Sequence, residues 1–188
     1  GIQIKYLSFF FGIISILSFF NIIYSYYLNL YLNLDTYYLS LLCSIIISIF
    51  FYKFETTELK PNIYSKILTV FFGYILIPVV LSIPFYFSIY NLTFLNSYFE
   101  SISGFTSTGF TIFENIKHID QSLILWRSST QWIGGLYFLF SIIYLIDIYD
   151  ESLKKSLTNF ISFSSSEIFK QAVKIFILYS GLTLIIFI

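Results

Sequence analysis

The strongest constraint on the fold is a series of apolar stretches, each close to the length that crosses a membrane. A transmembrane helix needs about 20 predominantly apolar residues. Five stretches approach this length, namely Tyr6–Leu28, Tyr37–Phe54, Ile67–Tyr90, Leu123–Ile146 and a fifth from about Ile168 to Ile188. With 57% apolar and 11% charged residues, the chain is too apolar for an ordinary soluble domain. The sequence therefore predicts an all-α membrane protein.

The basic residues between these stretches predict an orientation. With the N-terminus in the cytoplasm, most lysines fall on the inner side, namely Lys5, Lys53, Lys60, Lys66, Lys154, Lys155, Lys170 and Lys174. Lys117 and Arg127 then fall on the outer side. Basic residues are enriched in cytoplasmic loops, so we expect a cytoplasmic N-terminus. This orientation requires residues 91–122 to leave and re-enter the membrane on the outer side.

A polar, glycine-containing segment, residues 99–111 (FESISGFTSTGFT), separates the third and fourth stretches. The residues leading into it fit a helix of about 10–12 residues ending near Phe105. Such a helix is about 15–18 Å long, half the thickness of the hydrocarbon core. Non-helical backbone at membrane depth is tolerated only inside protein or beside a water-filled path. The segment therefore predicts one re-entrant pore helix followed by a filter loop.

The two ends of this short helix carry different signals. Ser97 and Glu100 have the spacing of a capping box, in which each side chain accepts a hydrogen bond from a backbone amide. Thr93 and Asn96 are alternative N-caps. The C-terminal end of a helix carries a partial negative charge, so a cation is favoured beyond Phe105 and an anion is not.

The loop after the helix has the composition of a cation filter. Such filters replace the hydration shell of an ion with backbone carbonyl oxygens, and glycine adopts the unusual dihedrals this requires without steric cost. We expect the carbonyls of Ser107, Thr108 and Gly109 to hold the ion, with Thr106 as support. The hydroxyl groups either fasten the loop or serve as ligands. The alternative is an ordinary outer turn in which Thr108-Gly109 separates two helices.

Residues in the fourth stretch are expected to support the loop. Arg127 either snorkels to the lipid head groups or braces the loop through Glu100. Gln131, Gly134 and Gly135 share one helical face, and small residues allow close helix contact in membranes. We therefore expect both glycines to pack against the pore helix and Gln131 to bond loop carbonyls.

Several other classes of protein are excluded. The net charge of zero provides no basic field for nucleic acid. The lone cysteine, Cys43, lies in an apolar run and can form neither an internal disulfide nor a metal site. The sequence contains no nucleophile–base set, metal-ligand cluster or phosphate-cradling glycine loop. We therefore expect neither enzyme activity nor a bound cofactor.

Residues 99–111, followed by LILWRSSTQWIGG at 123–135, resemble the first pore loop and second pore-lining helix of the Trk/Ktr/HKT superfamily of potassium transporters. The bacterial Trk potassium-uptake membrane subunits are the most similar group. Residues 166–184 also resemble the start of that family's next repeat. The resemblance implies that Ser107, Thr108, Gly109 and Phe110 occupy the filter positions of the first repeat.

The resemblance also implies four membrane–pore-loop–membrane repeats around one potassium path. The chain would then be an N-terminal fragment of three parts. These are an N-terminal helix pair (1–60), the first repeat (61–150), and a cytoplasmic linker with the truncated first helix of the second repeat (151–188).

The function implied by the resemblance is potassium uptake across the cytoplasmic (inner) membrane of a bacterium, with the potassium ion as substrate. The implied partners are membrane lipid, a second copy of the full-length subunit and a cytosolic nucleotide-binding regulatory subunit, without nucleic acid. One alternative is sodium- or proton-coupled symport, although proton coupling typically uses a carboxylate or histidine in mid-membrane. A membrane assembly subunit without transport activity is the other alternative.

Overall fold

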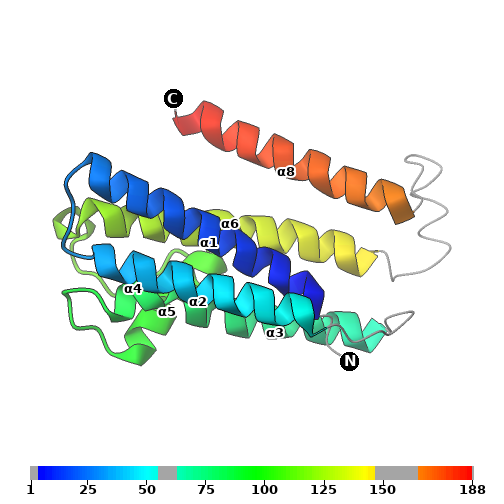
Figure 1. The fold of residues 1–188 in the computed structure, drawn as a ribbon, viewed down its shortest axis with the longest axis horizontal. Coiled ribbons are helices and arrows are strands. Elements are labelled where there is room, and N and C mark those ends of the chain that lie inside the picture. Colours follow the sequence, from blue (N-terminus) through cyan, green and yellow to red (C-terminus); the bar gives the residue numbers. More distant parts are fainter. Residues whose placement is uncertain (1–3, 55–62, 147–164, 188) are drawn as a thin grey trace. The chain divides into compact units, whose positions relative to one another are not determined.

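The computed structural model describes residues 4–54, 63–146 and 165–187, and these ranges contain helices and connecting segments without a strand (Figure 1). The helices are α1 (Ile4–Tyr27), α2 (Leu34–Lys53), α3 (Ile63–Leu81), α4 (Ile83–Tyr86), α5 (Phe94–Phe105), the short 3₁₀ helix η1 (Ile116–His118), α6 (Gln121–Ile146) and α8 (Ser165–Phe187). The chain divides into two compact units, Gly1–Gly135 and Leu136–Ile188. The all-α prediction is confirmed for the described residues.

Three helical segments are long and apolar enough to cross a membrane: Ile4–Tyr27, Leu34–Lys53 and Ile63–Tyr86. They correspond to the first three predicted stretches. The fourth predicted stretch is the continuous helix α6, which is not among these three. Its first half carries Arg127, Gln131 and several hydroxyl residues, whereas its second half is largely apolar.

Helices α1 and α2 form an antiparallel pair joined by hydrogen bonds between serines. The hydroxyl of Ser8 donates to the carbonyl of Ser48 (2.8 Å), and that of Ser18 donates to the hydroxyl of Ser40 (3.3 Å). Ser18 is fully buried, whereas Phe20 on the outer face is 59% exposed. Small residues at helix contacts are typical of membrane helices. The pair therefore leaves large apolar side chains such as Phe20 exposed on its outer face, as contact with lipid requires.

The third membrane segment is interrupted between α3 and α4, where prolines weaken the helix. Pro78 lies inside α3 and Pro84 lies in the first turn of α4. The indole nitrogen of Trp126 donates to the carbonyl of Leu81 (2.9 Å), and the hydroxyl of Ser101 donates to the carbonyl of Pro78 (2.7 Å). Side chains of α5 and α6 thus bond carbonyls near the break between α3 and α4.

Candidate functional site

The predicted pore helix is α5, a helix of 12 residues, Phe94–Phe105, about 18 Å long at 1.5 Å per residue. Its N-cap is Thr93, whose side chain accepts a hydrogen bond from the backbone amide of Asn96 (3.2 Å). Ser97 lies inside the helix, and its hydroxyl donates to the carbonyl of Thr93 (2.9 Å). The predicted capping box on Ser97 and Glu100 is therefore wrong and the alternative N-cap Thr93 is confirmed, because the helix begins one turn earlier.

The C-terminal end of α5 closes with a Schellman motif. The amide of Ser107 donates to the carbonyl of Gly104 (3.0 Å), and the amide of Thr108 donates to the carbonyl of Ser103 (3.0 Å). Ser107 has φ +57°, at the position where this motif usually has glycine. Gly109 has φ +79°. The loop therefore contains two residues in the left-handed conformation. The sequence predicted this conformation for Gly109 but not for Ser107.

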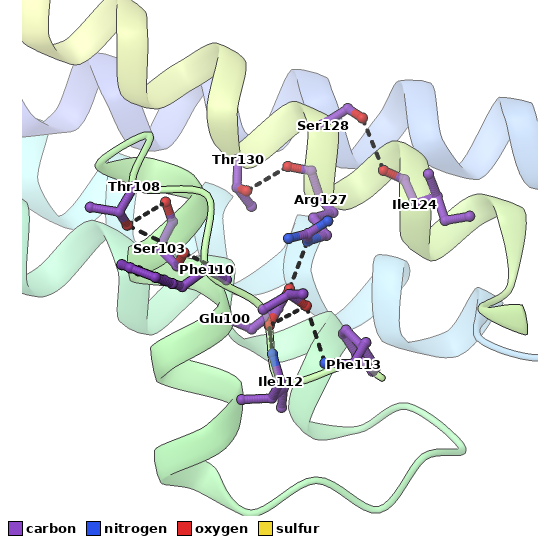
Figure 2. A network of polar contacts seen from close by, with 11 residues as sticks. Glu100, Ser103, Thr108, Phe110, Ile112, Phe113, Ile124, Arg127, Ser128 and Thr130 are labelled. Atoms are coloured by element: carbon purple, nitrogen blue, oxygen red, sulfur yellow. Dashed lines mark hydrogen bonds and ion pairs between the residues drawn. The ribbon is translucent and has the colours of Figure 1, made fainter. Parts of the chain in front are cut away.

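The hydroxyl groups of the loop fasten it to α5 (Figure 2). Thr106 Oγ1 donates to the carbonyl of Ile102 (2.7 Å), and Thr108 Oγ1 donates to the carbonyl of Ser103 (3.1 Å). Ser103 Oγ in turn donates to the carbonyl of Phe110 (2.6 Å). The sequence left two roles open for the threonine hydroxyls, as ligands or as groups that fasten the loop. In the structure they fasten the loop.

Backbone carbonyls of the same loop are left without partners. In the part of the chain that the structure describes, no hydrogen bond is donated to the carbonyls of Thr106, Ser107, Thr108 or Gly109. These four residues are exposed. The loop thus presents consecutive acceptor oxygens directly after the negative end of a helix.

Behind the loop, the buried carboxylate of Glu100 connects three segments (Figure 2). It accepts hydrogen bonds from Arg127 Nε of α6 (2.6 Å), from Thr111 Oγ1 (2.9 Å) and from the amide of Ile112 (3.0 Å). The side chain of Glu100 is fully buried and that of Arg127 is 16% exposed. Arg127 therefore braces Glu100 rather than reaching toward lipid head groups.

Two glycines allow α5 and α6 to approach closely. A Cβ atom on Gly134 would overlap the backbone of Phe105, and one on Gly104 would overlap the side chain of Thr130. Gly135 is partly buried, while Gln131 is exposed. Among the described residues, Gln131 makes no hydrogen bond to the loop, so its proposed role stays a prediction.

A second polar network joins the α1–α2 pair to the start of α6. Asp120 Oδ2 accepts hydrogen bonds from Ser122 Oγ (2.6 Å) and from Asn33 Nδ2 (3.2 Å). The hydroxyl of Tyr37 lies 2.8 Å from that of Ser122. No local sequence pattern indicated this network, because Asn33 and Asp120 are 87 positions apart.

Residues 35–188 match the family model of TrkH, described as a cation transport protein. This chain belongs to the TrkH family. The membership and the three apolar helical segments identify a membrane protein of a transporter family. The resemblance read from residues 99–135 is thereby confirmed at the level of the family.

Individual relatives of this TrkH-family chain are also named as cation or potassium transporters. It is 28% identical over 127 residues to an uncharacterised cation transporter of Methanocaldococcus jannaschii, covering 66% of this chain and 27% of the relative. It is 40% identical over 60 residues to the Trk system potassium uptake protein TrkI of Halomonas elongata, covering 32% of this chain and 11% of the relative. It is 37% identical over 64 residues to the Trk system potassium uptake protein TrkG of Escherichia coli K12, covering 34% of this chain and 13% of the relative.

The chain therefore spans about a quarter or less of the length of these relatives. No solved structure matches it significantly.

Proposed function

We propose that this chain supplies the first filter segment of a potassium uptake transporter. The carbonyl oxygens of Ser107, Thr108 and Gly109 would replace water around the ion. The observation that carries this proposal is that residues 106–109 are exposed and that none of the described residues donates a hydrogen bond to their carbonyls. A dehydrated cation needs such oxygens, held in place before it arrives.

The electrostatics of α5 support the choice of a cation. The partial negative charge at the C-terminal end of a helix adds to the carbonyl dipoles of the loop. The carbonyl of Phe110 already accepts the hydroxyl of Ser103, so the proposed ligand set ends at Gly109. Phe110 then marks the boundary of the filter.

The proposal includes a re-entrant path for residues 91–122. Helix α5, with its 12 residues, is too short to cross a hydrocarbon core of about 30 Å. We propose that the N-terminal pair (1–60) precedes a first repeat (61–150), followed by a linker and the start of a second repeat (151–188). Residues 1–3, 55–62, 147–164 and 188 of this division lie outside the described residues.

The complete transporter would surround one potassium path with four such repeats, in the cytoplasmic membrane and with a cytoplasmic N-terminus. The second copy of the full-length subunit and the cytosolic nucleotide-binding regulatory subunit belong to the same proposal. They rest on the resemblance of residues 99–135 to Trk subunits. The names of the potassium uptake relatives support the choice of ion.

Replacement of Gly109 by alanine tests the filter. A left-handed conformation costs a non-glycine residue about 1–2 kcal/mol, and Gly109 has φ +79°. No atom lies within 4 Å of the added Cβ, so the effect is conformational rather than steric. We expect Rb⁺ uptake by the full-length protein, measured in cells lacking other potassium uptake, to fall about fivefold or more. Discrimination against Na⁺ should fall as well.

Gly12→Ala is the control for this experiment. An added Cβ at Gly12 would lie 3.7 Å from Ser48 Oγ, an ordinary contact, and this glycine lies within α1. Uptake should be unchanged in the control once it is normalised to the amount of protein in the membrane. If Gly109→Ala also preserves uptake and ion discrimination, the proposed filter is wrong.

Cysteine labelling tests the re-entrant path. Asn96 and Lys117 flank the loop and are exposed, as is Lys53 at the end of α2. In the full-length protein with its own cysteines replaced, including Cys43, we expect a membrane-impermeant maleimide to label Asn96→Cys and Lys117→Cys in intact cells. Lys53→Cys should be labelled only after the cells are opened. Labelling of the two flanking positions from opposite sides would show that α5 crosses the membrane.

A further inference from the structure

We propose that Ser103 is a positioning residue that determines which carbonyls of the filter loop face the ion. This inference rests on the proposed function of the loop. Ser103 is 3% exposed and lies in the last turn of α5. It does not belong to the segment that would touch the ion.

Ser103 contacts the loop on both sides of Gly109. Its carbonyl accepts hydrogen bonds from the amide of Thr108 (3.0 Å) and from the hydroxyl of Thr108 (3.1 Å). Its own hydroxyl donates to the carbonyl of Phe110 (2.6 Å). Figure 2 shows Ser103 between Thr108 and Phe110. Both neighbours of the filter glycine are therefore held by one residue.

This double contact constrains the direction of the loop carbonyls. With Thr108 and Phe110 held by Ser103, the backbone between them passes through Gly109 at φ +79°. The carbonyl of Phe110 is directed to Ser103, whereas the carbonyls of Thr108 and Gly109 receive no hydrogen bond from the described residues. Ser103 thus separates ligand carbonyls from a structural one.

The hydroxyl of Ser103 is used in an uncommon way. Serine inside a helix commonly returns its hydroxyl to a carbonyl three or four residues earlier, as Ser97 and Ser101 do in the same helix. The hydroxyl of Ser103 instead reaches forward to residue 110. Alanine removes this bond, cysteine offers a weak donor, and threonine keeps the hydroxyl.

The experiment compares Ser103→Ala, Ser103→Cys and Ser103→Thr in the full-length transporter. The measured quantity is the ratio of Rb⁺ uptake to Na⁺ uptake, which does not depend on the amount of protein. Loss of one buried hydrogen bond should lower this ratio about three- to tenfold in the alanine and cysteine variants. The threonine variant should keep most of it. Ser97→Ala is the matched control, because Ser97 is fully buried in the same helix and bonds only its own turn.

Two results would overturn the inference, and they are distinguishable. If Ser103→Ala and Ser103→Cys keep the ratio within twofold while Gly109→Ala lowers it, the filter stands and the role of Ser103 is wrong. If Gly109→Ala also leaves the ratio unchanged, the proposed filter fails and the inference fails with it. The cysteine variant, close to serine in size, provides the test should Ser103→Ala fail to accumulate.

Discussion

Gly134→Ala is expected to force α5 and α6 apart and to reduce sharply the amount of folded protein. The added Cβ would overlap the carbonyl oxygen, carbonyl carbon and Cα of Phe105. These are backbone atoms, so no change of side-chain rotamer can relieve the overlap. Overpacking of this kind costs about 1–3 kcal/mol, and more where the neighbour is rigid.

The measurement is the apparent melting temperature of the detergent-solubilised full-length protein, together with its abundance in the membrane. Gly12→Ala is the control, because a Cβ on Gly12 would lie 3.7 Å from Ser48 Oγ, an ordinary contact. We expect a lower melting temperature for Gly134→Ala than for Gly12→Ala. Equal melting temperatures would mean that α5 and α6 do not pack as described.

Glu100→Ala is expected to be the most destabilising change at the site. It removes the partner of Arg127, whose side chain is 16% exposed, and the acceptor used by Thr111 and Ile112. Breaking a buried ion pair on one side costs about 3–5 kcal/mol, because it leaves an uncompensated charge. The segment after the filter loop also loses its attachment to α5, so uptake should fall along with stability.

A double substitution separates the ion pair from the rest of the network. Arg127→Met removes the charge that Glu100→Ala would strand, so the double variant should be more stable than the sum of the single effects predicts. It should not recover uptake, because the carboxylate contacts to Thr111 and Ile112 stay absent. Simple additivity of the two changes in melting temperature would contradict the coupling of Glu100 and Arg127.

The sequence predicted the helices of this chain well, because apolar length is a direct physical requirement of a membrane. It also predicted the end of α5 at Phe105 and the close packing of Gly134. The sequence left the N-cap open between Ser97, Thr93 and Asn96, because all three side chains can cap a helix. Which of them caps depends on where the incoming chain is extended, and Thr93 has ψ 158°.

The details of the loop depend on contacts that local patterns do not encode. The left-handed Ser107 completes a helix-terminating motif in place of the usual glycine. The hydrogen bond from Ser103 to the carbonyl of Phe110 forms only because residue 110 folds back on α5. The attachment of Asn33 to Asp120 likewise requires knowledge of which helices are neighbours.

The buried ion pair has a consequence for the kind of cation that such a loop would attract. The carboxylate of Glu100 is cancelled by Arg127, so it adds no net charge beside the loop carbonyls. Attraction by backbone dipoles is modest at each oxygen, whereas small divalent ions give up their water reluctantly. On the proposed function, a loop with these carbonyls would discriminate by charge as well as by size. It would admit monovalent ions and leave magnesium in solution.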